Sequence, residues 1–262
     1  MIISILIIGG LAVGVMSSFF GIGGGAIMVP LLYALFPTLD NTIIISTSLT
    51  TVFFITTINS YQFFREKYFK NKKQIVLIIF STIIGGLTGG LFTNVIGTEP
   101  SKQILAVILF LSLVRLYFYQ EPENKKKKIQ SWKLILTGLM GSFISSITGL
   151  GGGIVFVPML LSFVMLDSKR VSAYSNLMMM TATLMGALPH LFTPIVSIDL
   201  IPTEIAAYFI GKINLGIVTI FVLGGVIGAF MGRIFNNSIG ASLKKKLFSL
   251  LLLALIAKLL FF

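Results

Sequence analysis

The sequence predicts an all-α polytopic membrane protein with two inverted-topology repeats, whose glycine-broken helical hairpins meet near the bilayer midplane. Three observations lead to this fold class. Of the 262 residues, 56% are hydrophobic and only 11% are charged, whereas soluble domains are roughly a quarter charged. The apolar runs are continuous rather than alternating, which favours helices over a membrane β-barrel. A glycine-rich motif occurs once in each half of the chain.

Ten hydrophobic segments account for most of the chain. We expect helices over residues 2–20, 25–36, 42–64, 74–97, 102–119, 133–149, 153–166, 171–193, 213–235 and 244–262. A helix needs about 20 apolar residues to cross a bilayer. The segments 25–36 and 153–166 are shorter than this, and each directly follows a glycine cluster. We therefore expect both to be arms of broken helical hairpins.

The most polar stretch, QEPENKKKKIQS, cuts the chain nearly in half. It contains Pro122 and four consecutive lysines. We expect an N-terminal membrane repeat over residues 1–120, a cytoplasmic basic linker over 121–132 and a C-terminal membrane repeat over 133–262.

The two halves carry the same features in the same order. Residues 21–30 read GIGGGAIMVP and residues 149–158 read GLGGGIVFVP, so four glycines and a proline coincide at an offset of 128. At the same offset, Thr47 and Ser48 align with Ser175 and Asn176. Later in each half, GGLTG at 85–89 resembles GGVIG at 224–228. Such self-similarity at a fixed spacing indicates an internal duplication.

The basic residues predict how the halves are oriented. There are 20 basic and 8 acidic residues, giving a net charge of +12, and cytoplasmic loops of membrane proteins carry an excess of Lys and Arg. If the halves were parallel, 13 basic residues would be inside. If each glycine region instead folds back as a hairpin, the second half is inverted, 17 are inside, and only Lys102, Lys212 and Lys258 are outside. The inverted arrangement is therefore favoured, with both termini outside.

The glycine clusters are the first candidate for a functional site. Glycine tolerates positive φ and lets the backbone approach a ligand closely. A helix that begins after such a break directs free N–H groups and its positive dipole end at the cavity, which suits an anion. The alternative is that small residues only permit tight helix crossing. The exact duplication next to short segments favours a binding site, with backbone contributed by Gly23, Gly24, Gly25, Gly151, Gly152 and Gly153.

Small polar side chains within apolar segments are the second candidate. An anion held without a fixed cation needs hydrogen-bond donors, and we expect Thr47, Ser48, Ser175 and Asn176 to supply them. The alternative for the hydroxyl groups is a bond to the backbone carbonyl one turn earlier. Asn176 is the stronger candidate because its amide is harder to accommodate in lipid.

Other notable residues are expected to serve the membrane fold. Asn59 and Gln62 lie close to the basic loop, which predicts an interfacial position. Arg233 is near a cytoplasmic helix end and can extend to the interface. His190 is expected to be an interfacial or capping residue, with proton coupling as the alternative. Small-xxx-small spacing predicts helix packing at Gly85, Gly86, Gly89, Gly90, Gly224, Gly228 and Gly232.

Two copies of a GxGGG…VP element, each followed by a small polar pair, resemble the TauE/SafE family of membrane proteins. The copies read SSFFGIGGGAIMVPLL and SSITGLGGGIVFVPMLL, and the later GGLTGG and GGVIGAFMGR stretches extend the resemblance over essentially the whole chain. Family members are described as prokaryotic plasma-membrane transporters associated with sulfite export and with sulfonates. The resemblance thus implies a multi-pass anion permease in the cell membrane of a prokaryote.

We therefore expect a secondary transporter that exports a small sulfur-containing oxyanion, such as sulfite or an organosulfonate, by alternating access. A passive anion channel of the same architecture is the alternative. The expected partners are the anionic substrate and the lipid bilayer, with protons as a candidate coupling ion, a homodimer as a candidate assembly, and no nucleic acid. An enzyme is not expected, because the eight carboxylates are scattered at segment ends. With no cysteine and one histidine, we expect neither a metal nor a cofactor.

Overall fold

A computed structural model of the chain describes two blocks in each half. They cover residues 2–69, 71–93, 129–194 and 208–238, together with the single positions 95, 103, 107, 110, 111, 113, 114, 243, 246, 247, 249, 250 and 253. Most of the predicted linker at 121–132 lies outside the described residues. The same holds for most of the helices predicted at 102–119 and 244–262, and for Lys102 and Lys258.

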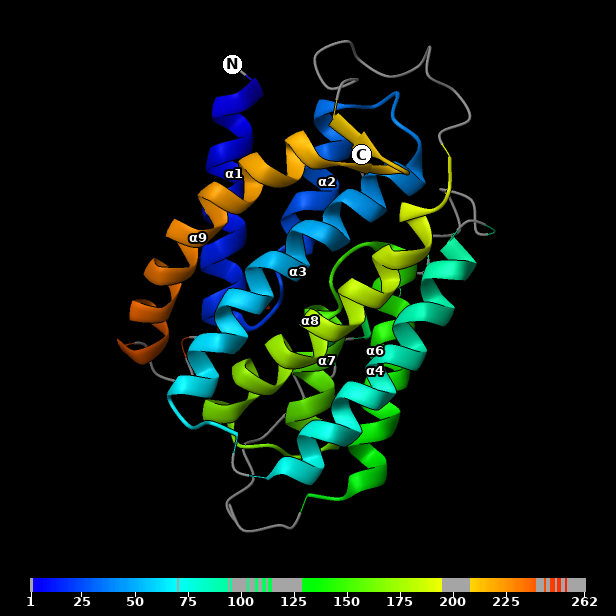
Figure 1. The fold of residues 1–262 in the computed structure, drawn as a ribbon. Coiled ribbons are helices and arrows are strands. Elements are labelled where there is room, and N and C mark those ends of the chain that lie inside the picture. Colours follow the sequence, from blue (N-terminus) through cyan, green and yellow to red (C-terminus); the bar gives the residue numbers. More distant parts are fainter. Residues whose placement is uncertain are drawn as a thin grey trace.

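The described chain is almost entirely helical (Figure 1). Its elements are α1 (Ile2–Phe20), α2 (Gly25–Leu35), α3 (Asn41–Arg65), α4 (Lys72–Thr93), α6 (Ser131–Thr148), α7 (Gly153–Pro158), the π-helical turn η1 (Met159–Phe163), α8 (Ser168–Leu191), β1 (Phe209–Ile210), β2 (Ile213–Asn214) and α9 (Leu215–Ser238). The helices predicted within the described blocks are confirmed, except that 153–166 is α-helical only to Pro158 and then forms η1, and that 213–214 belong to β2. The antiparallel pair β1–β2, which joins Phe209 to Asn214, was not predicted.

Local capping groups set several of these boundaries. The carboxylate of Asp40 accepts a hydrogen bond from the backbone N–H of Thr42 at 2.7 Å, so α3 begins there. Asn214 does the same for α9, since its Oδ1 accepts from the N–H of Ile217 at 2.8 Å. At its C-terminus, α6 ends at Gly149, which has φ 72°. These are common helix start and stop signals.

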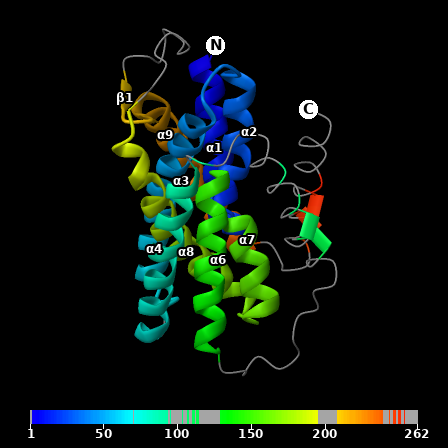
Figure 2. The same cartoon turned by 90° about the vertical axis from the view of Figure 1, so that its right-hand side faces the viewer.

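Two helical hairpins enter the molecule from opposite ends (Figure 1, Figure 2). The α1–α2 hairpin comes from the end where α1 begins, and the α6–α7 hairpin comes from the other end. Between them, α3 and α8 run in opposite directions and pack on each other. The outer helix α9 lies along α1, and α4 lies along α6. The glycine ends of the two hairpins therefore lie in the middle of the molecule.

The outer seams are closed by glycines. A Cβ on Gly228 would lie 2.1 Å from the carbonyl oxygen of Leu11, and one on Gly85 would lie 2.3 Å from that of Leu139. Gly86 faces α8 in the same manner. Helix backbones approach this closely only where side chains are missing. The packing role predicted for these glycines is confirmed, and it holds for Gly85, Gly86, Gly89, Gly90, Gly224, Gly228 and Gly232.

The outer faces of the bundle are apolar. Phe80 on α4 and Ile234 on α9 are 67% and 66% exposed, and other large apolar side chains on both helices are also exposed. In the described part of the chain, three helices are long and apolar enough to cross a membrane: Asn41–Arg65, Lys72–Thr93 and Leu215–Ile234. Shorter apolar helices cover Ile3–Phe19, Gly25–Leu35 and Gly153–Phe163. Apolar exteriors of this kind fit an all-α membrane protein.

Candidate functional site

The two glycine motifs adopt the same backbone conformation. Positive φ occurs at three corresponding positions of each motif: +73°, +81° and +70° at Gly21, Gly23 and Gly24, and +72°, +74° and +79° at Gly149, Gly151 and Gly152. A left-handed conformation costs a residue with a Cβ roughly 1–2 kcal/mol. The chain therefore reverses sharply at both motifs, and α2 and α7 begin directly after the break.

The two breaks touch each other through their backbones. A Cβ on Gly25 would lie 2.5 Å from the carbonyl carbon of Leu150, and one on Gly153 would lie 2.2 Å from that of Ile22. Neither Gly25 nor Gly153 has positive φ. Glycine is required at these two positions because the backbone of the other motif leaves no room for a Cβ. The motifs thus cross backbone to backbone, with all glycines of the crossing buried.

Each central helix holds the motif of the other half. The Ser48 hydroxyl on α3 donates to the carbonyl oxygen of Gly149 at 2.7 Å. The Ser175 hydroxyl on α8 donates to the carbonyl oxygen of Gly21 at 2.5 Å. Two of the predicted small polar residues therefore lie at the crossing. In this structure their protons are bonded to the motif carbonyls.

These bonds correct the predicted alignment of the central helices. Ser48 and Ser175 occupy equivalent places, whereas the offset of 128 paired Ser48 with Asn176. The offset in α3 and α8 is 127, because the connection from Pro158 to Asp167 is one residue shorter than that from Pro30 to Asp40. The sequence pattern concealed this one-residue deletion, since two small polar residues follow each other in both halves.

Asn176 belongs to a buried amide cluster beside the first break. Its Oδ1 accepts from the Ser17 hydroxyl at 3.3 Å and from the Asn59 amide at 3.0 Å. The Asn59 amide also donates to Ser17 Oγ at 3.0 Å, and all three side chains are fully buried. The depth of Asn59 relative to the membrane interface stays a prediction, but its burial inside the protein was not predicted. Its place along α3 lies near the basic loop, but its side chain faces inward to Ser17 and Asn176.

Thr47 lies apart from the crossing. Its Oγ1 accepts from the backbone N–H of Asn214 at 3.1 Å, while the neighbouring Ser46 hydroxyl donates to the carbonyl oxygen of Lys212 at 2.7 Å. Both bonds fix the β1–β2 hairpin to α3. His190, which accepts from the N–H of Lys212 through its carbonyl at 2.9 Å, is fully buried. His190 thus lies in the last turn of α8 under the unpredicted hairpin, and its carbonyl binds the hairpin there, in keeping with the predicted capping role. The predicted interfacial depth in the membrane stays a prediction.

Several donors at the crossing have no acceptor within the described part of the chain. These are the backbone N–H groups of Gly23, Gly24, Gly25, Gly151, Gly152 and Gly153. The Ser145 hydroxyl, at the second break, is also buried without a partner among the described residues. Together these uncharged groups can bind an anion by hydrogen bonding and by the positive ends of helix dipoles.

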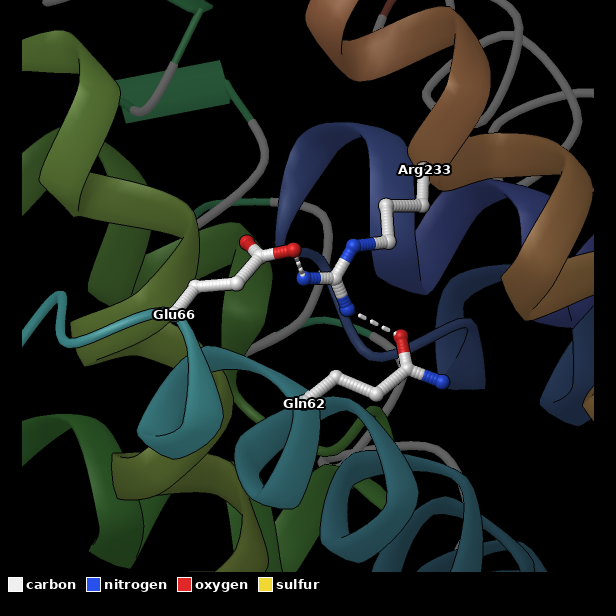
Figure 3. A network of polar contacts seen from close by, with 3 residues as sticks. All are labelled: Gln62, Glu66 and Arg233. Carbon is white, nitrogen blue, oxygen red and sulfur yellow. Dashed lines mark hydrogen bonds and ion pairs between the residues drawn. The ribbon is translucent and has the colours of Figure 1, made fainter.

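At the far end of α3, an ion pair connects α3 to α9 (Figure 3). The guanidinium of Arg233 pairs with Glu66, donates to Gln62 Oε1 and lies 5.5 Å from the ring centre of Phe63. The Arg233 side chain is 16% exposed and that of Glu66 is 44% exposed. Arg233 thus lies near the end of α9, and its side chain is bound to α3, a contact that the sequence did not predict.

The fold and the glycine crossing define a helical membrane protein with paired broken helices, an arrangement that transporters use around their substrates. Comparison with protein families then identifies the family to which the chain belongs. The model of the sulfite exporter TauE/SafE family matches residues 6–259, and the chain belongs to this family. It is a membrane transporter, as its relatives' names also indicate.

Those relatives come from a bacterium and an archaeon. A probable membrane transporter protein of Haemophilus influenzae is 27% identical, covering 97% of this chain and 94% of its own length. Another of Methanocaldococcus jannaschii is 26% identical, covering 91% and 88%. A further H. influenzae protein of the same description is 32% identical over 59% of this chain and 61% of its own length. No solved structure matches the chain.

Proposed function

We propose that the chain is a secondary transporter that exports a small sulfur-containing oxyanion, such as sulfite or an organosulfonate, by alternating access. The family description supports the substrate class. In this proposal the anion binds at the glycine crossing, and the two halves then move about it. Protons are the candidate coupling ion.

The observation that carries the proposal is the crossing itself. Six buried glycine N–H groups from two helix breaks have no acceptor among the described residues. Because unsatisfied buried donors are costly, a ligand with several acceptor oxygens is the natural partner. The Ser48 and Ser175 hydroxyls adjoin this place, and Asn176 supports it through Ser17. Thr47 acts only indirectly in this scheme, by fixing the β1–β2 hairpin.

We also propose that the halves are inverted repeats in the cell membrane of a prokaryote, with both termini outside. The opposite directions of the two glycine hairpins and the reciprocal Ser48 and Ser175 bonds support this arrangement, and so does the distribution of basic residues. The crossing then lies near the bilayer midplane. A terminal tag that reacts only from the cytoplasmic side would contradict this orientation.

Reconstitution into liposomes tests the transport proposal. The purified chain is given sulfite, sulfate, thiosulfate and a series of organosulfonates, with and without a pH gradient, and protein-free liposomes are the control. We expect saturable flux and counterflow for sulfite or an organosulfonate. Large unitary currents without counterflow would indicate a channel, and the absence of flux for every anion would refute the proposal.

A further inference from the structure

Two apolar side chains stand between the glycine breaks. Val52 on α3 and Met179 on α8 follow Ser48 and Ser175 by one helical turn, and both are fully buried. The register set by the two serine bonds makes them equivalent residues of the two halves. Val52 and Met179 are called the central apolar pair here.

Val52 lies beside the corresponding glycines of both motifs, Gly23 and Gly151, and Met179 lies beside Gly23. A Cβ on Gly23 would lie 2.5 Å from the sulfur of Met179 and 3.2 Å from a methyl carbon of Val52. A Cβ on Gly151 would lie 2.6 Å from the same methyl carbon of Val52. The space beside Gly23 is therefore filled by both side chains and that beside Gly151 by Val52, so a larger residue at position 23 or 151 would displace them.

In this position the central apolar pair would contact the proposed substrate. An anion held by the free N–H groups of Gly23 and Gly151 must border the two side chains or push them aside. A strongly hydrated dianion would lose its water against an apolar surface without compensation. An anion whose charged group carries a small apolar substituent would place that substituent there. Met179 is flexible and can adjust, whereas Val52 is stiff at χ1.

We propose that Val52 and Met179 are the specificity-determining residues of this transporter, contacting the uncharged part of the anion and limiting its size. This inference rests on the proposed anion transport at the glycine crossing. In a fitted apolar pocket, one methylene group changes discrimination by about 10- to 200-fold. Changing the volume of either side chain is therefore expected to move the preferred substrate length.

The test is competition for flux by methane-, ethane-, propane- and butanesulfonate in proteoliposomes. Met179→Ala enlarges the space and is expected to favour the longer sulfonates by about tenfold relative to wild type. Val52→Ala, a milder truncation, should shift the profile in the same direction, and Val52→Ile in the opposite one. Met178→Ala is the matched control, since Met178 is an equally buried methionine about 100° further round α8. Its chain-length profile should equal that of wild type.

The outcomes separate this inference from the transport proposal. If the wild type moves none of the sulfonates and no sulfite, both are overturned. If the wild type transports and the Met179 and Val52 variants keep its chain-length profile, the specificity role alone is overturned. An equal shift in Met178→Ala would also overturn it, because general loosening of α8 would then explain the change.

Discussion

The two glycine breaks have the same backbone conformation but differ in the polar groups beside them. Ser17, before the first break, is bonded to Asn59 and Asn176. Its counterpart Ser145, before the second break, has no partner among the described residues. The register of α3 and α8 explains this, because Gly186 and Leu49 stand where the two asparagines would be. The duplication thus preserved the crossing, while an amide cluster fixes only the first break.

A second difference follows the motif prolines. The arm after the first break remains α-helical from Gly25 to Leu35, whereas the arm after the second break changes at Pro158 into the π-helical turn η1. Such turns occur often at functional sites. Both differences make the second break the less constrained one, and we expect it to move more during transport.

Substituting alanine for a glycine of the crossing should destabilise the protein equally in both halves. This is the largest effect that we expect. Gly25→Ala and Gly153→Ala each push a methyl group into the opposite backbone. We expect each to destabilise the protein by about 3 kcal/mol, at the upper end of overpacking costs. The measurement is unfolding in detergent. Gly216→Ala is the control, since its nearest neighbour is a Tyr208 side-chain atom at 3.1 Å. Wild-type stability of either Gly25→Ala or Gly153→Ala would contradict the backbone contact.

The amide cluster should distinguish the halves. Asn176→Leu leaves Ser17 and Asn59 with unsatisfied polar atoms and is expected to cost about 1–3 kcal/mol. Ser145→Ala removes a buried hydroxyl that has no partner among the described residues, so this variant is expected to be as stable as wild type or more stable. Unfolding of both variants under one condition measures the contrast. Equal destabilisation would mean that the two breaks are supported alike.

Among the variants that break a contact within the protein, the smallest expected effect belongs to Arg233. A lysine cannot reproduce the two directed contacts of the Arg233 guanidinium, so Arg233→Lys should weaken the link between α9 and α3. Because Glu66 is 44% exposed, we expect a loss of at most about 1 kcal/mol. The wild-type stability should fall with added salt more than that of the variant. Identical salt dependence in the two proteins would show that the ion pair contributes nothing.

The fold was predictable from the sequence where the signals are local. Apolar runs set the helix positions, and the glycine motifs fixed both breaks, since positive φ and backbone contact demand glycine there. The inward direction of Asn59 was not predictable, because its place along α3 says nothing about which neighbour its side chain meets. The equivalence of Ser48 and Ser175 was hidden by a deletion of one residue before α8. The β1–β2 hairpin, which decides the positions of Thr47 and His190, is too short for a periodic pattern.

The proposed anion site lies where the two glycine breaks cross. Binding of sulfite and of ethanesulfonate to the purified protein, measured by calorimetry, tests it most directly in wild type, Gly24→Ala and Gly152→Ala. Both glycines have positive φ, and a Cβ would lie 2.2 Å from Val13 and 2.7 Å from Phe156, respectively. With folding checked by gel filtration, we expect both variants to lose most of the wild-type affinity. Unchanged affinity in both folded variants would contradict anion binding at the crossing.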